Sequence, residues 1–193
     1  MATSPLDSVN ALTSWETVQG FAGAKDEDMD NINRLINGSS LLLNSLTNRK
    51  LKARALTEYY DGDGSDIILL RERPCNSVTY LYDDPERSWG ATTVVTSTDY
   101  TVITEEGKII GTGTSFSTGY KVLKIIYNGG LSAIPMDLEM TCVELVSYWY
   151  NKFYKAKVGI KSVTNEGRSM TYIDDIPQIV YTVAEKYRKY WVG

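Results

Sequence analysis

The chain has 193 residues, of which 42% are hydrophobic and 23% are charged, and its formal net charge is −4. This composition is ordinary for a globular protein, and the length suits one domain that can bury a sizeable core. The sequence contains no histidine, so the commonest general base and the commonest ligand of catalytic zinc are both missing.

The order of residues argues against membrane and secreted classes. No apolar run approaches the roughly 20 residues that cross a bilayer. Residues 1–20 lack the basic and apolar regions of a secretory signal. The two cysteines, Cys75 and Cys142, lie far apart in different kinds of segment. We therefore expect no membrane partner, and buried thiols in a reducing compartment instead of a disulfide.

Two helices are predicted at the N-terminal end. In residues 12–23, Thr13 and Glu16 have the spacing of a capping box, and Gly23 suits a left-handed stop. Residues 26–51 begin with three acidic side chains, which favour a helix N-terminus, and apolar residues then recur at helical spacing. Gly38 interrupts that apolar face and permits close approach by a neighbouring element.

The middle of the chain has the pattern of strands and hairpins. Its segments are short, rich in β-branched and aromatic residues, and bounded by Gly, Asp, Asn or Pro. The predicted strands lie within residues 56–60, 66–72, 77–84, 99–106, 107–111 and 120–130. Gly107 is expected at a tight hairpin turn, and residues 111–119 are expected to form a polar loop.

Two further helices are predicted near the C-terminus. Residues 134–159 have Pro135 at the first turn, a broad apolar face and a closing glycine. A polar loop, 162–175, separates this first helix from the second one, which is predicted over 177–192. We expect an α+β fold, with a helical core of about four helices and an antiparallel β insertion. The whole chain, 1–193, is predicted to be one domain, divided into 1–54, 55–131 and 132–193.

One short stretch matches part of a calcium-loop template. Positions 1, 3, 5 and 12 are filled by Asp61, Asp63, Ser65 and Glu72. The template also needs glycine at position 6 and helices on both sides, but Asp66 stands at that position and both flanks are strand-like. The Asp-Gly pairs at 61–62 and 63–64 are instead hairpin-turn signals. No metal site is predicted here.

The remaining chemical motifs are explained by local structure. The glycines of residues 111–119 lack the spacing of a dinucleotide-binding loop. The carboxylate pairs at 83–84, 105–106 and 174–175 lie at predicted turns, where solvated acidic residues are common. The lysines between 152 and 161 do not make a basic surplus that would support tight nucleic-acid binding. We predict no catalytic residues and no cofactor.

Two segments carry residues suited to protein contacts. The first is the C-terminal set Tyr187, Arg188, Tyr190 and Trp191, whose types anchor interfaces, although Tyr187 and Trp191 could equally cover the helical core. The second is the polar loop 162–175, which is too long for a simple turn between helices. We expect neighbouring subunits to meet through the helical core and this loop, with contacts at Asn165, Arg168, Met170 and Tyr172.

The ordered series of segments resembles a known family. The carrying segments are "LTSWETVQGFAG" with "DEDMDNINRLINGSS", then "EYYDGDGSDIILLRERPCNSVTYLYDD", and finally "IPMDLEMTCVELVSYWYNKF" with the residues up to Tyr190. This series is similar to the head–tail connector (adaptor) proteins of tailed bacteriophages, in their longer members with a β insertion. The resemblance covers nearly the whole chain. Where the family usually has small alanines, this chain has glycine and serines at 38–40.

The resemblance implies a structural role in the virion. Such proteins form a ring, commonly of twelve subunits, beneath the portal, at the neck between head and tail. They extend the DNA channel and present a surface to a stopper or tail-completion protein. It also implies assembly in the host cytoplasm and portal contacts in the C-terminal region. An acidic chain suits a lumen through which DNA slides without specific binding.

Two other classes of function stay open at this point. A β-rich tail-accessory or ligand-binding module would recognise its ligand with its hairpin loops. A carboxylate-based hydrolase would need two carboxyl groups roughly 5–10 Å apart in a cleft.

Overall fold

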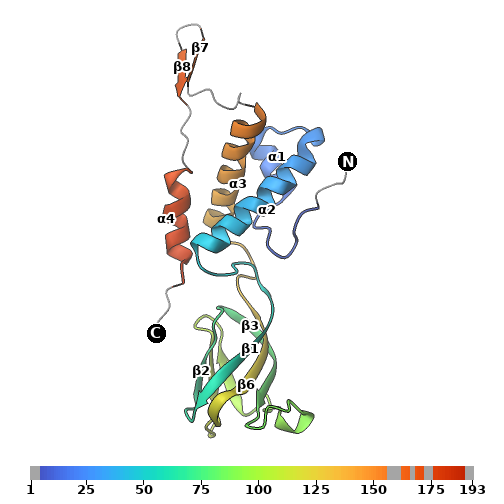
Figure 1. Ribbon diagram of the computed structural model, residues 1–193, viewed down its shortest axis with the longest axis vertical. Helices are drawn as coiled ribbons and strands as arrows, with labels where there is room; N and C mark the ends of the chain where they lie inside the picture. Colours follow the sequence, from blue (N-terminus) through green and yellow to red (C-terminus); the bar gives the residue numbers. More distant parts are fainter. Residues whose placement is uncertain (1–4, 156–161, 166–167, 172–175, 190–193) are drawn as a thin grey trace. The chain divides into compact units, whose positions relative to one another are not determined.

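The computed structural model describes residues 5–155, 162–165, 168–171 and 176–189. The chain divides into two compact units, which we call the helical unit (Met1–Arg49 with Ile134–Gly193) and the β unit (Lys50–Ala133) (Figure 1). The described residues form α-helices and antiparallel sheets, so the predicted α+β class, with helices before and after a β insertion, is confirmed. The prediction that residues 1–193 act as one domain stays a prediction. No helix in the described residues is long and apolar enough to cross a membrane.

The helical unit contains the four expected helices. They are α1 (Trp15–Ala22), α2 (Met29–Leu46) after a 3-10 turn at Asp26–Asp28, α3 (Met136–Tyr150) before a π turn at Asn151–Lys155, and α4 (Gln178–Tyr187). Gly23 ends α1 in the left-handed conformation, as predicted. The predicted N-cap was wrong by one residue, because Ser14 caps α1 and the Thr13 hydroxyl donates to Glu139 instead.

The apolar faces of these helices meet in one core. Its fully buried members are Val18, Ile32, Ile36, Leu43, Leu138, Cys142, Val143, Leu145, Val146 and Val180. Residues 38–40 lie in this packing: the Ser40 hydroxyl accepts from the Leu12 amide at 3.1 Å and lies 3.7 Å from the Cys142 sulfur. An added Cβ at Gly38 would lie 3.7 Å from the Trp149 ring, an ordinary contact. The core therefore has room for an alanine at Gly38.

The C-terminal part of this unit differs from its prediction in two ways. The predicted loop 162–175 contains a hairpin, β7 (Ser162–Asn165) and β8 (Arg168–Thr171), paired in antiparallel register. The predicted helix 177–192 ends at Tyr187, where Arg188 becomes extended. The Lys189 amide then donates to the Thr47 carbonyl at 2.9 Å, so a tertiary hydrogen bond replaces another helical turn.

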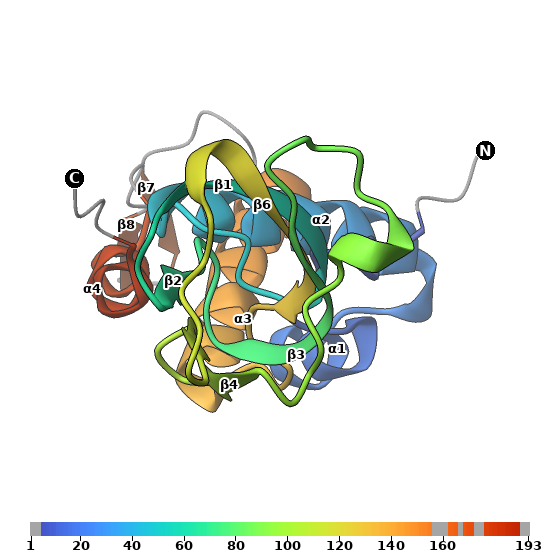
Figure 2. The ribbon, with the colours of Figure 1, turned by 90° about the horizontal axis from the view of Figure 1, so that it is seen from below.

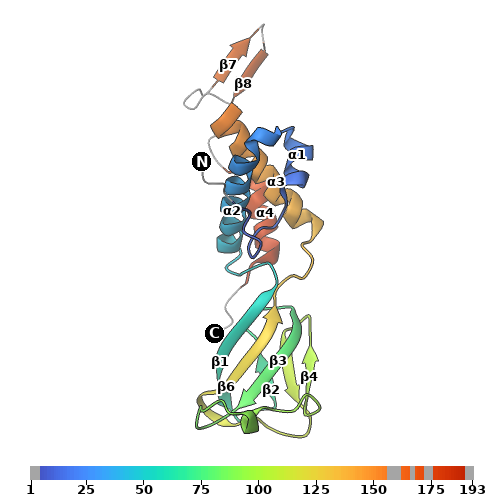
Figure 3. The ribbon, with the colours of Figure 1, turned by 90° about the vertical axis from the view of Figure 1, so that its right-hand side faces the viewer.

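The β unit confirms all six predicted strands. They are β1 (Arg54–Asp63), β2 (Ile67–Leu69), β3 (Cys75–Asp83), β4 (Tyr100–Ile103), β5 (Lys108–Gly111) and β6 (Thr118–Gly129). They form two antiparallel sheets, in the orders β1-β6-β3 and β2-β5-β4 (Figure 3). Gly107, at φ 59°, turns the β4–β5 hairpin as expected. A long connection with a short 3-10 turn at Ala91–Thr93 joins β3 to β4 (Figure 2).

The two sheets pack face to face around a shared core. Side chains alternate along each strand, so one set faces inward and the other faces solvent. The inward set and the adjoining loops supply Tyr60, Ile68, Leu70, Cys75, Leu81, Ile109, Phe116, Val122, Leu123, Ile125 and Tyr127. Each sheet consequently keeps an outer face of its own, and the two outer faces point in opposite directions.

Both free cysteines, Cys75 in the β unit and Cys142 in α3, are buried, as predicted.

The two Asp-Gly pairs have different roles. The pair at 63–64 is a turn, as predicted, with Gly64 at φ 83° and the Ser65 amide donating to Asp63 at 2.9 Å. That turn connects two sheets and not two paired strands. The pair at 61–62 is not a turn, because it lies at a bulge in β1 where the register with β6 shifts.

Candidate functional site

The calcium-loop residues make hydrogen bonds within the β unit. Asp61 accepts from the Lys121 amide at 2.8 Å, which joins the bulge of β1 to β6, and Asp63 accepts from Ser65. Glu72 is buried, and its amide donates to the Tyr127 hydroxyl. Within the described residues, no three His, Cys, Asp or Glu side chains converge in a way that could hold a metal ion. A hollow of about 270 Å³ beside Asp61 and Asp63 is also lined by apolar side chains, among them Ile68, Phe116 and Leu123.

We predict that residues 58–72 bind no calcium at micromolar concentration. The two aspartates already accept backbone hydrogen bonds, and Asp66 stands at position 6, where calcium loops need glycine for their sharp turn. Isothermal titration of the full chain with CaCl₂ checks this. Micromolar affinity that disappears in Asp61→Ala would contradict it.

A cluster of titratable groups in the β unit holds its strands together. The hydroxyls of Tyr60 and Tyr127 both donate to the Glu58 carboxylate, and they accept from the Arg71 and Glu72 amides. Burial raises the pKa of both tyrosines well above the ordinary value. The two phenols therefore stay protonated as donors, and the cluster ties β1 and β6 to the segment after β2. Such an arrangement supports a structural role.

Asp84 departs from the prediction of a solvated turn. Its side chain is almost fully buried, at 2% exposure. It accepts hydrogen bonds from the Glu86, Arg87 and Trp89 amides and from the Ser88 hydroxyl, at 2.7–3.1 Å. Burial disfavours the charged form, but the hydrogen bonds outweigh it, so the pKa of Asp84 lies below its usual range. We call residues 84–89 the Asp84 loop; its last residue is Trp89.

Trp89 completes a row of aromatic side chains on the outside of β1-β6-β3. Tyr59, Lys124 and Tyr82 are in register across the three strands. The Trp89 ring lies 5.5 Å from that of Tyr59 and 6.3 Å from that of Tyr82. The Lys124 ammonium lies 5.1 Å from the Tyr82 ring centre and 5.7 Å from that of Trp89. With Tyr80, which lies 6.0 Å from Tyr82, these residues form what we call the aromatic face.

The aromatic face cannot be recognised from the sequence alone. Alternation predicts which side chains of one strand share a side, but it does not tell which side is buried or which strands are neighbours. The tyrosine spacing in β3, at 80 and 82, is the sequence signal that two aromatic rings share one face.

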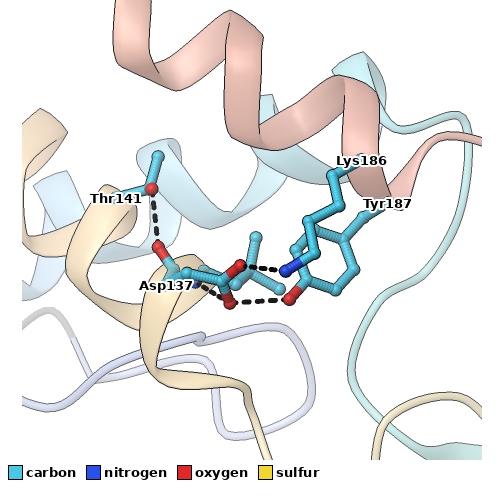
Figure 4. A network of polar contacts seen from close by, with 5 residues as sticks. Asp137, Thr141, Lys186 and Tyr187 are labelled. Atoms are coloured by element: carbon cyan, nitrogen blue, oxygen red, sulfur yellow. Dashed lines mark hydrogen bonds and ion pairs between the residues drawn. The ribbon is translucent and has the colours of Figure 1, made fainter.

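The last turn of α4 is fastened to the first turn of α3. The Tyr187 hydroxyl donates to Asp137 Oδ1 at 2.6 Å, and the Lys186 ammonium pairs with Asp137 Oδ2 at 2.6 Å (Figure 4). Thr141 donates to the Asp137 carbonyl in the same turn. The hydrogen bonds from Lys186 and Tyr187 lower the pKa of Asp137, and the same contact raises the pKa of Lys186.

The predicted interface residues that the structure describes lie at the C-terminal end of α4 and in the β7–β8 hairpin. Tyr187 is half-buried and bonded to Asp137, while Arg188 is exposed and pairs with Glu185 at 3.2 Å. Asn165 and Arg168 are paired in the β7–β8 hairpin, and Met170 lies in β8. Three predicted residues lie outside the described ones: Tyr172, Tyr190 and Trp191.

Comparisons with known proteins identify the family of this chain and proteins of similar fold. The sequence matches the head completion protein family (HCP) over residues 11–190. No curated protein matches the chain.

Solved structures with a similar fold come from gene transfer agent (GTA) particles. The neck of an empty GTA particle with C6 symmetry gives a TM-score of 0.63 at 17% identity, covering 100% of this chain and 98% of the other. The neck of a native particle with C12 symmetry gives 0.59 at 17%, with the same coverage. A chain from the virion of the native particle gives a TM-score of 0.58 at 18% identity, and the match covers 90% of this chain and 84% of the other.

These identities are low, so the structural likeness concerns the fold. The match to the family spans most of the chain, including both helical segments and the β unit between them. It agrees with the resemblance to head–tail connectors that the order of segments predicts. The chain belongs to the head completion protein family.

Proposed function

We propose that this protein is a head–tail connector, a structural subunit at the neck of a tailed virus particle. The match to the head completion protein family over residues 11–190 carries this proposal. The likeness in fold to chains from the necks of GTA particles supports it. The location is then the head–tail interface of the virion, reached after assembly in the host cytoplasm.

The proposed form is a closed ring, with twelve subunits as the expected number. The C6 and C12 symmetries of the similar neck structures support a ring. Its partners are the portal protein on one side and a stopper or tail-completion protein on the other. DNA passes through the lumen without specific binding, which suits a chain of net charge −4.

The proposed role is structural and not enzymatic. The carboxylate pair at 83–84 illustrates the reason: Asp84 is buried and saturated by the loop that follows it, and Asp83 accepts from the Ser117 amide at 3.0 Å. A hydrolase would need such carboxylates accessible in a cleft. The chain also lacks histidine.

We predict that the C-terminal segment docks on the portal. Removing residues 188–193 should abolish portal binding and change the melting temperature little. The reason is that Tyr187, Lys186 and Asp137 stay in place, while among the described residues the Lys189–Thr47 bond and the exposed Arg188–Glu185 pair are lost. Such a bond contributes about 1 kcal/mol. Pull-down with portal and thermal melting measure the two effects.

The control is Phe21→Ala, which truncates an exposed aromatic ring of α1 and should leave portal binding unchanged. Full portal affinity in the truncated chain would rule out the docking role. A fall of many degrees in melting temperature would show that the segment belongs to the core.

We predict that the β7–β8 hairpin contributes to contacts between subunits. Deleting residues 164–170 removes half of β7 and all of β8 except Thr171, and it should block ring formation without unfolding the rest. Mass photometry in the presence of portal reports ring formation, and circular dichroism reports folding. Rings of normal size from the deletion variant would show that the hairpin is not needed for contacts between subunits.

Electron microscopy of the full chain mixed with its cognate portal tests the proposed function. We expect rings seated on the portal, with one copy of this chain at each repeated position. A β-rich accessory or ligand-binding module would instead remain unassembled beside the portal.

A further inference from the structure

The outer face of the β2-β5-β4 sheet is unusually apolar. Ile67, Leu69 and Ile103 are 44%, 63% and 36% exposed, although the exposed side of such a sheet is normally polar. The register places Ile67 beside Ile110, and it places Leu69 in line with Lys108 and Ile103. Lys108 is the one charged side chain in these rows, and its ammonium pairs with Glu106 at 2.5 Å. We call Ile67, Leu69, Ile103 and Ile110 the aliphatic face.

The opposite side of the same unit carries the aromatic face. Tyr59 and Tyr80 are 38% and 48% exposed, and both rings neighbour other members of that face. The two sheets share one core, so the aliphatic and aromatic faces belong to a single packed unit and point away from each other. Exposed apolar surfaces of this kind mark sites of protein contact.

Contacts within the β unit hold the aromatic face in place. The Asp84 carboxylate fixes the loop through four hydrogen bonds, and Trp89 takes a left-handed backbone conformation at φ 55° at its end. Its ring then rests against Tyr59 and Tyr82. A surface that is already ordered loses little conformational entropy when it binds.

We propose that the aliphatic face of one copy packs on the aromatic face of the next copy, so that the β units build a layer of the ring. This inference rests on the proposed function, because a ring is required for the contact to repeat. A closed ring larger than a dimer needs two different, complementary surfaces on each subunit. The two outer faces of the β unit meet that requirement.

The chemistry of the two faces is complementary. Aliphatic side chains pack well on aromatic rings, and both faces lose water when they meet. Charged groups of opposite sign also lie on the two sides. Glu105 and Glu106 lie in the turn next to the aliphatic face, whereas Lys124 lies within the aromatic face and Arg87 belongs to the Asp84 loop. Each side also carries one group of the other sign, because Lys108 pairs with Glu106 and Glu86 precedes Arg87. Opposite charges at the rim of a contact set its register.

Disulfide trapping in the full chain tests the contact. Leu69→Cys and Tyr80→Cys are combined in one chain, whose own two cysteines are buried. After assembly on the portal and mild oxidation, we expect a ladder of covalent oligomers on a denaturing gel, and none from the unassembled monomer. The control pair, Leu69→Cys with Phe21→Cys, should give no ladder.

A charge exchange gives a second measurement. Glu105→Arg or Lys124→Glu alone should lower the trapping yield several-fold, and the two together should restore it. A fold defect would not be rescued in this way, so the rescue distinguishes contact from misfolding.

The outcomes separate this inference from the proposed function. If wild-type chains form rings on the portal but the 69–80 pair gives no ladder, the inference is wrong and the connector function stands. If Leu69→Cys reacts with a maleimide in the ring and becomes protected when the stopper is added, the aliphatic face binds the stopper and the inference is again wrong. If wild-type chains form no ring on the portal, both proposals fall.

Discussion

Gly62→Ala is expected to destabilise the β unit strongly. A Cβ added at Gly62 would lie 1.7 Å from the Ser117 carbonyl oxygen and 3.0 Å from a Val122 methyl group. The Ser117 backbone cannot retreat cheaply, because its amide donates to Asp83 at 3.0 Å. Forced overpacking of this kind costs about 3 kcal/mol or more. We expect the melting temperature of the β unit to fall by more than about 10 °C in calorimetry.

Gly20→Ala provides the matched control for this substitution. Gly20 lies in α1, and a Cβ there has nothing within 4 Å. Alanine in a helix is favoured over glycine by roughly 0.5–1 kcal/mol. The control should therefore keep or slightly raise stability. A Gly62→Ala protein that melts with the wild type would show that β1 and β6 are not held together at this bulge.

Asp84→Asn is expected to lower stability strongly at neutral pH. An amide at this position keeps the size of the side chain but loses the charge. Its NH₂ group would also face backbone N–H groups that now donate to the carboxylate, so donor would meet donor. We expect thermal melting at pH 7 to fall by several degrees. Asp66→Asn, whose side chain is exposed, is the control and should melt like the wild type.

The stabilisation by Asp84 should depend on pH in a defined direction. Its pKa is lower in the folded state than in the unfolded state, so folding favours the charged form. The contribution is fully present above the unfolded pKa of about 3.9 and disappears as pH falls through the folded pKa. The gap in melting temperature between wild type and Asp84→Asn should therefore shrink below about pH 4. A gap that stays constant from pH 7 to pH 3 would contradict this account.

The sequence alone predicts the strands and helices well, because each carries its own periodicity and its own boundary residues. Gly107 and Gly23 illustrate this, since a left-handed backbone at a turn or helix end favours glycine wherever it occurs. The same local rules do not separate the Asp-Gly pair at 61–62, which forms a bulge, from the pair at 63–64, which forms a turn. That difference depends on Ser117, which directly precedes β6, and on Lys121 within β6.

The candidate surfaces were harder to predict because they depend on distant pairings. The sequence around Asp84 is typical of a solvated turn. The Asp84 carboxylate is nevertheless buried, and four hydrogen bonds from the Asp84 loop offset the cost of removing its charge from water. Tyr59, Lys124 and Tyr82 become neighbours through the register of three strands. For α4, the sequence pattern continues past Tyr187, but the bond from Lys189 to Thr47 ends the helix there.

A cryo-electron microscopy reconstruction of the neck in purified particles is the most direct test of the connector function. We expect a ring of copies of this chain at the head–tail interface, directly beneath the portal, around the DNA channel. A neck that contains no copy of this chain, or that carries it as isolated copies on the tail, would contradict it.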